Sequence, residues 1–205
     1  MPVKHRRKGS SRTAVGARLT GGEAAGRRLL TEVATDLRAT TGLARAACFN
    51  ILGDQVEGAR VVDLFAGAGS LGLEALSRGA SLATFVELSR RRAKLIEANL
   101  VSLEWADRAE VVVGDAISWL RRQQEALTAC RLVLLDPPYR EAGAQLCLDS
   151  LRILGGVATA YSQWEPLVVA EHHRDLSVPA EIGALNCVRT ARYGTTTLSF
   201  YRRLP

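Results

Sequence analysis

Four consecutive residues, Asp136-Pro137-Pro138-Tyr139, could bind an amine and hold it for the transfer of a group. Two prolines fix two backbone φ angles and remove two N–H donors, so the loop is stiff and its carbonyls point outward as acceptors. An amine conjugated to a heteroaromatic ring is a poor nucleophile, and the Asp136 carboxylate and the Pro137 carbonyl could accept its two N–H groups. Tyr139 offers a flat face on which an extruded base could stack. We therefore predict catalytic roles for Asp136, Pro137 and Tyr139 and a substrate contact for Pro138.

A glycine-rich segment, residues 63–72 (DLFAGAGSLG), is the second group with recognisable chemistry. Its glycines satisfy the G-x-G-x-x-G spacing of a dinucleotide site, and Glu87 follows Gly67 by 20 residues, as a ribose-binding acid would. A pyrophosphate, however, requires backbone N–H groups without a nearby negative charge, and Asp63 lies directly before the loop. S-adenosylmethionine (SAM) has no phosphate and carries a cationic sulfonium and ammonium, which the Asp63 carboxylate favours. The charge pattern therefore predicts SAM, whereas the spacing alone would predict NAD.

Acids that follow successive predicted strands suit the remaining parts of SAM. Glu87 can accept both ribose hydroxyls, and Asp115 can accept from the exocyclic amine of adenine. The candidate cofactor-binding residues are Asp63, Phe65, Gly67, Gly69, Glu87, Asp115 and Ala116. We expect SAM as the cofactor and S-adenosylhomocysteine (SAH) as its product. No metal is expected, because the His and Cys residues show no ligand spacing.

Strand and helix patterns alternate along the chain from residue 60 onward. Short apolar runs predict strands at 60–65, 82–88, 110–114, 131–136 and 167–171. Helices are expected at 70–78, 89–99 with Ser89 as the cap, 116–127 and 142–154, and a closing hairpin at 185–189 and 196–202. This alternation predicts an α/β fold with a doubly wound, mostly parallel sheet and one antiparallel strand. Ligands of such sheets bind at the carboxyl ends of the strands, so the two loops should lie side by side.

The excess positive charge is concentrated at the N-terminus. The net charge is +6, and residues 1–28 hold eight lysines and arginines against one acid, Glu23. Such an arm is typical of a tail that binds a polyanion, with nucleic acid the leading candidate and a solubilising or targeting tail the alternative. Candidate substrate contacts in the arm are Lys4, Arg6, Arg7 and Lys8. After the arm, residues 15–40 predict a small hairpin and residues 43–52 a helix.

Composition restricts the class of protein and its compartment. The 205 residues suffice for one domain, and 47% hydrophobic with 23% charged residues is ordinary for a globular protein. Four scattered cysteines are typical of a reducing compartment. No apolar run reaches the about 18 residues that a membrane span needs, and no apolar segment of a signal peptide follows the basic start. We therefore expect a cytoplasmic protein that does not bind a membrane.

These motifs resemble the RsmD family, the bacterial 16S ribosomal RNA guanine-N2 methyltransferases. The resemblance is carried by residues 63–80 (DLFAGAGSLGLEALSRGA), Phe85-Val86-Glu87, Asn99 and residues 134–139 (LLDPPY). Flanking segments at 18–29, 49–52, 193–194 and 198–201 agree, so the resemblance covers roughly residues 18–203. The core motifs are shared by amino-methyltransferases in general, and the flanks are what point to this family.

The resemblance implies a Rossmann-like SAM-dependent methyltransferase fold with a seven-stranded sheet and a small N-terminal extension of a hairpin and a helix. It implies methyl transfer to the exocyclic N2 of one guanine in 16S rRNA, with the small ribosomal subunit as partner. Gly67, Gly69, Glu87 and Asp115 carry over to cofactor binding, and Asp136, Pro137 and Tyr139 to the amine site. The expected organisation is a mobile basic arm (1–14), an RNA-contacting extension (15–53) and a methyltransferase domain (54–205), acting as a monomer.

One segment departs from the family. The family pattern before the first helix reads roughly R-P-T-T-D-R-V-R-E, whereas residues 38–46 read RATTGLARA. Arg38, Thr40, Thr41 and Arg45 persist. Because the segment lies near the cofactor and the target base in the family, Arg38 and Arg45 are candidate substrate contacts.

Three other functions remain open at this point. The Asp136 loop also suits an amino-methyltransferase that acts on DNA adenine, another RNA or a protein amide, although the basic arm disfavours a protein substrate. The changed 38–46 segment would suit a SAM-binding RNA assembly factor without turnover. An NAD-dependent oxidoreductase is disfavoured, because Tyr139 lacks the lysine four residues later that short-chain dehydrogenases use.

Overall fold

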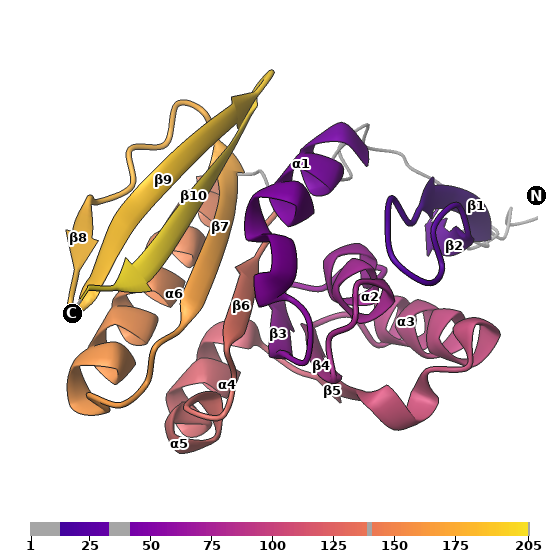
Figure 1. Ribbon diagram of the computed structural model, residues 1–205, viewed down its shortest axis with the longest axis horizontal. Coiled ribbons are helices and arrows are strands. Elements are labelled where there is room, and N and C mark those ends of the chain that lie inside the picture. The colour runs from indigo at the N-terminus through magenta and orange to yellow at the C-terminus, as the bar shows by residue number, and fades with distance from the viewer. Residues whose placement is uncertain (1–12, 33–41, 139–140, 205) are drawn as a thin grey trace, which may run out of the picture.

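The computed structural model of the chain describes residues 13–32, 42–138 and 141–204, and five neighbouring parallel strands form one side of its main sheet (Figure 1). These strands are β3 (Arg60–Leu64), β4 (Leu82–Glu87), β5 (Ala109–Val113), β6 (Leu132–Leu135) and β7 (Leu167–His173). They lie in the order β5-β4-β3-β6-β7, so the chain builds outward from β3 first in one direction and then in the other. The reversal makes the carboxyl ends of β3 and β6 neighbours at a topological switch point, where open α/β sheets bind ligands.

Three further strands extend the sheet beyond β7. In antiparallel pairs, β10 (Thr196–Arg203) joins β7, β9 (Leu185–Tyr193) joins β10, and β8 (Glu181–Ile182) joins β9. The sheet therefore has eight strands where seven were expected, because a two-residue strand such as β8 leaves no periodic pattern in the sequence. Relative to the parallel strands, β10 and β8 are reversed, whereas β9 runs with them.

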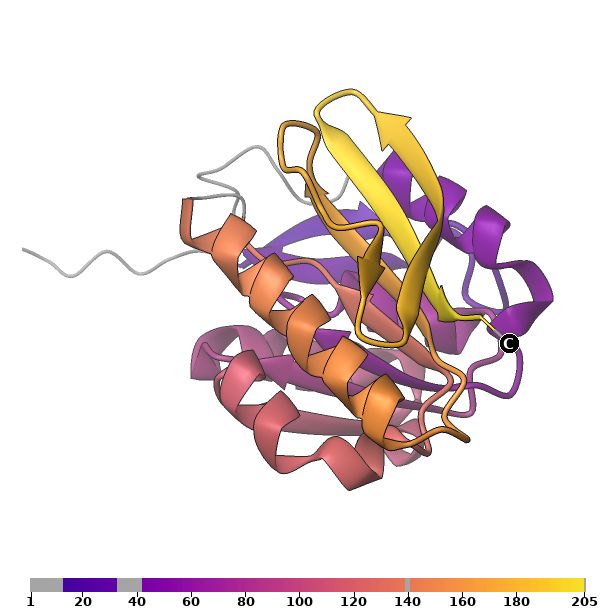
Figure 2. The ribbon, with the colours of Figure 1, turned by 90° about the vertical axis from the view of Figure 1, so that its left-hand side faces the viewer.

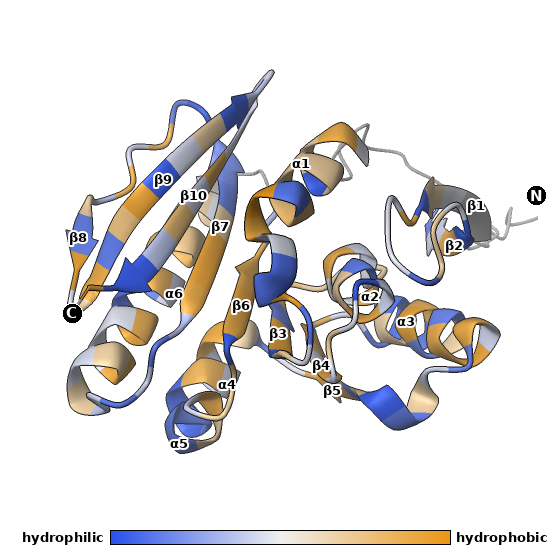
Figure 3. Ribbon diagram, viewed as in Figure 1, coloured by the Kyte–Doolittle hydropathy of each residue, from blue (hydrophilic) through white to orange (hydrophobic). Residues whose placement is uncertain are grey.

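Helices cover both faces of the sheet (Figure 2). One face carries α1 (Gly42–Leu52), α2 (Ser70–Ser77) and α3 (Arg90–Leu103), and the other carries α4 (Ala116–Arg122), α5 (Gln124–Leu127) and α6 (Glu141–Ala160). Two short 3-10 turns, Gly53–Gln55 and Ala106–Arg108, precede β3 and β5. Neighbouring strand residues alternate between the faces: Val61 packs against the first layer and Val62 against the second. This two-sided burial explains the continuous apolar runs, which colour β3, β6 and β7 orange in Figure 3.

The N-terminal hairpin is a separate two-stranded sheet that packs against the first helical layer. Its strands are β1 (Thr13–Arg18) and β2 (Arg28–Glu32), and Leu19 and Leu29 are buried in the same core as α1, α2 and α3. The buried side chain of Asn99 on α3 fixes β2 in place: its Oδ1 accepts from the Leu30 N–H at 2.7 Å and its Nδ2 donates to the Leu30 carbonyl at 3.0 Å. The hairpin predicted within residues 15–40 is confirmed, but it runs from Thr13 to Glu32 and so begins two residues earlier, inside the arm expected at 1–14.

Two helices differ from the prediction. The helix expected at 116–127 is divided at Gln123, where α4 ends and α5 begins. The helix expected at 142–154 continues through Gly155 and Gly156 to Ala160, because Leu154, Val157 and Ala158 are buried against the sheet and this packing outweighs the low helix propensity of glycine. None of the helices in the described ranges combines the length and apolar character that crossing a membrane requires.

The buried carboxylate of Glu74 on α2 joins the hairpin and α1 to the sheet. Its Oε2 accepts from the Thr20 N–H at 2.8 Å and from Arg45 Nε at 3.3 Å. Its Oε1 accepts from the Thr20 hydroxyl at 2.6 Å and from Arg78 Nε at 2.9 Å. Glu74 and Arg45 are 0% and 1% exposed, so each neutralises a charge that water does not reach.

Replacing Glu74 should destabilise the fold strongly. Glu74→Ala leaves the Arg45 guanidinium buried without its counter-ion, and we expect the free energy of unfolding to fall by about 3 kcal/mol. Urea denaturation of the wild type and the variant measures this difference. The matched control is Asp149→Ala, which removes the exposed ion pair with Arg152 and should cost under about 1 kcal/mol. Equal losses for the two variants would contradict the role assigned to Glu74.

Candidate active site

Three acids lie at the carboxyl ends of three adjacent strands and on the same face of the sheet. Asp63 on β3 pairs in register with Phe85 on β4 and with Leu134 on β6. Because strand side chains alternate, Glu87 and Asp136, each two residues further along, follow on the face of Phe85 and Leu134. The structure therefore brings the glycine loop and the Asp136 loop together, as the sequence predicts.

The glycine loop is held between β3 and β4. Ala66 donates its N–H to the Val86 carbonyl at 3.1 Å, and Gly67 donates its N–H to Glu87 Oε2 at 2.8 Å. Phe65 adopts a positive φ of 63°, which is costly for a residue with a bulky side chain. At Gly67, also with positive φ, a Cβ would meet only the Phe65 carbonyl oxygen, 4.0 Å away. The space over Gly67 is thus open to a ligand that approaches the backbone closely.

The Glu87 carboxylate is the most heavily hydrogen-bonded group in the site. Its Oε2 accepts from Gly67, while its Oε1 accepts from the Ser89 N–H at 2.7 Å and from Arg92 Nε at 2.9 Å. Arg92 Nη2 lies 2.8 Å from the same oxygen in an ion pair. The side chain is only 3% exposed. The predicted cap is also present, since Ser89 Oγ accepts from the Arg92 N–H at 3.4 Å.

Asp63 is buried and has one oxygen without a partner among the described residues. Its Oδ2 accepts from the Gly72 N–H at 2.8 Å, whereas its Oδ1 has no hydrogen bond there. Burial raises the pKa of Asp63 to about 7, the Gly72 N–H lowers it, and the charge of Glu87 raises it further. A buried, partly unsatisfied carboxylate is costly on its own and is relieved by a cation.

Asp115 and Ala116 lie at the adjoining end of β5. The Gly114 N–H donates to the Glu87 carbonyl at 3.0 Å, which keeps this turn beside Glu87. Asp115 is exposed and caps α4, with its Oδ1 accepting from the Ser118 N–H at 2.8 Å, and Ala116 is buried at 4% exposure. The predicted adenine contact of Asp115 is compatible with this position, because the helix cap uses Oδ1 and the contact can use the other carboxylate oxygen, Oδ2.

The donors and acceptors at this edge fit SAM. The unsatisfied Asp63 Oδ1 suits an ammonium, the Glu87 carboxylate suits a vicinal diol, and the open backbone at Gly67 admits close contact. When bound, SAM supplies a methyl group on a sulfonium, an electrophile that needs no metal. Within the described ranges, no three His, Cys, Asp or Glu side chains are grouped so that they could hold a metal ion.

The described part of the loop after β6, Asp136 to Pro138, lies next to the carboxyl ends of these strands. The Asp136 N–H lies 3.5 Å from the Leu64 carbonyl, Pro137 is buried and Pro138 is exposed. Helix α6 packs against the loop at Gly143. A Cβ at this position would come within 1.5 Å of the Pro138 carbonyl oxygen, so only glycine permits the approach. A small pocket beside the loop is lined by Pro137, Pro138, Gly143, Ala144, Glu171 and His172, among others.

The structure gives different outcomes for the predicted substrate contacts. Arg45 was expected to reach the substrate, but it is 1% exposed and held by Glu74 and by the Arg18 carbonyl. This part of the prediction is wrong. A buried guanidinium that is paired with Glu74 and the Arg18 carbonyl cannot reach a phosphate, and Arg45 positions α1 instead. Tyr139, Arg38 and the arm residues Lys4, Arg6, Arg7 and Lys8 lie outside the described residues.

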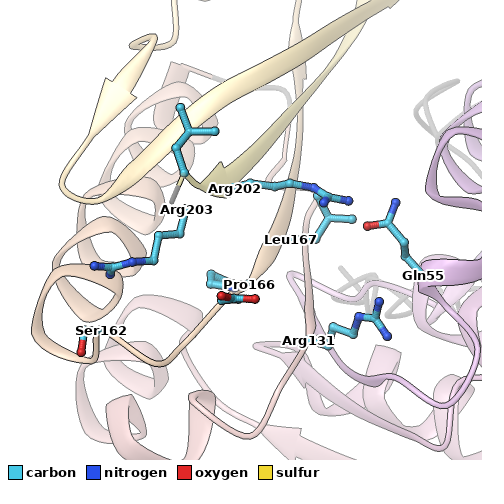
Figure 4. Close-up of a pocket in the computed structure, with 9 residues that line it drawn as sticks. Gln55, Arg131, Ser162, Pro166, Leu167, Arg202 and Arg203 are labelled. Carbon is cyan, nitrogen blue, oxygen red and sulfur yellow. The ribbon is translucent and has the colours of Figure 1, made fainter.

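A larger pocket of about 470 Å³ opens at the amino ends of the parallel strands, opposite the ends that carry the acids (Figure 4). Arg131 and Arg202 approach it from the start of β6 and the end of β10, and Gln55 lies across from them. None of the predicted site residues that the structure describes lines it. The acids and the loops predicted to carry the chemistry are therefore separated from this pocket by the length of the strands.

Sequence reasoning missed three supports of the site. Glu74 anchors the helix that follows the glycine loop, Arg92 binds Glu87, and Asn99 donates to the Ala68 carbonyl at 3.2 Å while it holds β2. Asn99 was noted only as part of a resemblance. Its hydrogen bond to the glycine loop joins two residues that are 31 positions apart in the sequence, so no local pattern predicts it.

Comparisons with known proteins agree with the geometry. Residues 17–202 match the protein family described as conserved hypothetical protein 95. Ribosomal RNA small subunit methyltransferase D of Escherichia coli (strain K12) is 32% identical over 186 residues, which span 91% of this chain and 89% of that protein. The solved structure of yhhF from Escherichia coli has a TM-score of 0.72 at 29% identity, over 91% of this chain and 97% of that one. The structure of SMU.776 complexed with SAH shares the fold, with a TM-score of 0.64 at 14% identity, over 86% of this chain and 54% of that one.

The sheet order, the glycine loop and the row of acids define the fold of the SAM-dependent methyltransferases. The match across residues 17–202 and the similarity to methyltransferase D go further, and the chain belongs to the RsmD family. The predicted family and fold class are thereby confirmed.

The raised pKa of Asp63 predicts opposite pH dependences for stability and for cofactor binding. A folded-state pKa of about 7 means that the native state holds this proton more tightly than the unfolded chain, so the stabilisation is present below pH 4 and is lost as the pH rises through about 7. Asp63→Asn keeps an acceptor for the Gly72 N–H and removes the titration. In urea unfolding without ligand, the wild type should therefore lose stability relative to Asp63→Asn between pH 5 and pH 8.

Binding of SAH should change in the other direction. The wild type should bind SAH more tightly as the pH rises through about 7, because the ionised Asp63 accepts the ammonium, whereas Asp63→Asn should bind weakly at every pH. Isothermal titration calorimetry at pH 6 and pH 8 measures both proteins. Parallel pH profiles for the two proteins, in unfolding and in binding, would contradict this account of Asp63.

Proposed function

We propose that the chain uses SAM to methylate the exocyclic N2 amine of a guanine in the 16S rRNA of the small ribosomal subunit. The observation that carries the proposal is that Glu87, Asp63 and Asp136 lie at the carboxyl ends of three neighbouring strands, which supports a cofactor half beside an amine half. The relative named ribosomal RNA small subunit methyltransferase D supports an rRNA substrate. The choice of guanine N2 rests on the resemblance of residues 134–139 and the flanking segments to the family.

The cofactor half would hold SAM through groups already in position. Asp63 would accept the ammonium, Glu87 the ribose hydroxyls and Asp115 the adenine amine, while Gly67 and Gly69 let the backbone approach. Phe65 and Ala116 would line the same site. These roles require no movement of the sheet, because the strands that carry the acids are paired along their length.

The amine half would work by orientation. The guanine N2 lone pair is delocalised into the ring, and two acceptors that bind both N–H groups favour a nitrogen whose lone pair faces the methyl group. Asp136 and the Pro137 carbonyl are the proposed acceptors, with Pro138 beside the base and Tyr139 stacked on it. The close packing of Gly143 against the Pro138 carbonyl suits the role, since a misplaced acceptor loses most of its effect.

The RNA is proposed to contact the N-terminal part of the chain. The arm (1–14) would bind phosphates through Lys4, Arg6, Arg7 and Lys8, and the extension (15–53) exposes Arg18, Arg27 and Arg28 on the hairpin. Arg38 would lie near the base, and residues 54–205 would form the methyltransferase domain. We place the protein in the cytoplasm as a monomer, where assembled small subunits are its partner.

Replacing Asp136 should abolish methyl transfer but not cofactor binding. With labelled SAM, the wild type should label small subunits that lack the modification, and the label should migrate with N2-methylguanosine after digestion. Asp136→Ala should lose at least about 100-fold in turnover, as removal of one preorganised hydrogen-bonding group typically costs, with SAH affinity unchanged. Asp149→Ala, an exposed acid on α6, is the control and should remain active.

The same assay separates the alternatives. Deproteinised 16S rRNA and duplex DNA are offered in parallel. Label in DNA alone would contradict the proposal and favour an adenine-directed enzyme. No label in any substrate, with SAH bound, would favour a binding factor without turnover.

The basic arm should contribute salt-dependent RNA affinity. A variant with Lys4, Arg6, Arg7 and Lys8 changed to Ala removes four cationic side chains, so the slope of log affinity against log salt should fall by roughly 3. Filter binding of 16S rRNA at several NaCl concentrations measures the slope. The control, Arg131→Ala with Arg202→Ala, changes the opposite edge of the sheet and should leave the slope nearly unchanged. An unchanged slope in the arm variant would show that the arm does not bind RNA.

A further inference from the structure

Arg92 occupies part of the acceptor capacity of Glu87. Its Nε donates to Glu87 Oε1 at 2.9 Å, and its Nη2 lies 2.8 Å from the same oxygen in an ion pair. The Arg92 side chain is 43% exposed, whereas the Glu87 side chain is 3% exposed. A partly exposed guanidinium therefore contacts a buried carboxylate.

Counting lone pairs shows what this contact prevents. A carboxylate offers about four acceptor positions, two on each oxygen. The backbone takes one on each, through the Gly67 N–H on Oε2 and the Ser89 N–H on Oε1. One position on each oxygen then remains, which matches the two hydroxyls of a vicinal diol. Arg92 fills the remaining position on Oε1, so only one hydroxyl can be accepted while Arg92 stays.

Arg92 is not needed to orient Glu87. The Gly67 and Ser89 N–H groups already fix both oxygens at 2.8 and 2.7 Å, and both belong to backbone that other hydrogen bonds hold. Release of the Arg92 side chain also leaves the helix intact, because the cap of α3 uses the Arg92 backbone N–H and Ser89 Oγ. The guanidinium can move into the solvent at little cost, as half-exposed ion pairs contribute little.

We propose that Arg92 is a removable plug of the ribose subsite: it covers Glu87 Oε1 in the free protein and leaves when Glu87 accepts the cofactor diol. Arg92 therefore weakens cofactor binding by the free energy needed to break its contact with Glu87. The inference rests on the proposed function, since it assigns the ribose hydroxyls to Glu87.

The test compares SAH binding by the wild type, Arg92→Ala and Arg91→Ala in isothermal titration calorimetry. SAH has no net charge, so the loss of a distant cation should not affect it. Arg91 is the neighbouring arginine of α3, 48% exposed and paired with Glu32 at 3.6 Å, and serves as the matched control. At low salt Arg92→Ala should bind SAH about fivefold more tightly than the wild type, and Arg91→Ala should not. The gain should shrink in 0.5 M NaCl, because salt screens the Arg92–Glu87 contact of the wild type.

A second ligand, SAH without its ribose 2′-hydroxyl, locates the effect. With a single hydroxyl, Glu87 Oε2 suffices and Arg92 can stay, so the gain of Arg92→Ala should disappear. Equal or weaker SAH binding by Arg92→Ala, or a gain that persists with the deoxy ligand, would overturn the proposal. Failure of all three proteins to bind SAH would overturn the proposed function as well, whereas wild-type binding without a gain in the variant would overturn only the role of Arg92.

Discussion

The carboxylate of Glu74 is the interaction on which the arrangement of the site depends. It lies on α2, the helix that begins where the glycine loop ends, and it receives Thr20 from the hairpin and Arg45 from α1. Three segments that are distant in the sequence are thereby fixed around one buried charge. Because a buried carboxylate is costly unless every acceptor is used, the hairpin and α1 cannot leave without destabilising α2. The described parts of the proposed RNA-contacting extension are thereby attached to the helix that follows the cofactor loop.

The sheet carries the chemistry to one edge. The parallel strands end together, and the switch in strand order makes the ends of β3 and β6 neighbours. Under the proposed function, Glu87 and Asp63 would face the cofactor and Asp136 the amine, so one row of acids would serve two purposes. The charges in the row have different environments: Glu87 is satisfied by backbone and Arg92, while Asp63 keeps an oxygen without a partner among the described residues. That difference suits Asp63 for a permanent cation and Glu87 for hydroxyls.

Local patterns predicted the elements that depend on local physics. Apolar runs located all five parallel strands, and Glu87, Asp63 and Asp136 were found because each lies at or near the carboxyl end of such a run. Contacts between distant segments were not predictable in this way. Glu74 looks like an ordinary polar position of a short helix, yet its partner Thr20 lies 54 residues earlier. Arg45 was predicted to contact the substrate from the family resemblance, and its ion pair with Glu74, 29 residues later, has no local pattern. Helix α6 continues past Gly155 and Gly156, and strand β8 was not predicted. Both differences have the same reason, because these segments are stabilised by neighbours that local sequence patterns do not reveal.

The central claim is that both halves of this edge act together on one guanine amine. Reaction of small subunits that lack the modification with SAM carrying a deuterated methyl group, followed by nucleoside mass spectrometry, tests it most directly. The account predicts a single deuterated nucleoside, N2-methylguanosine, at no more than one per subunit. Deuterium in methyladenosine, or at several unrelated guanines, would contradict the claim that this edge selects one exocyclic guanine amine.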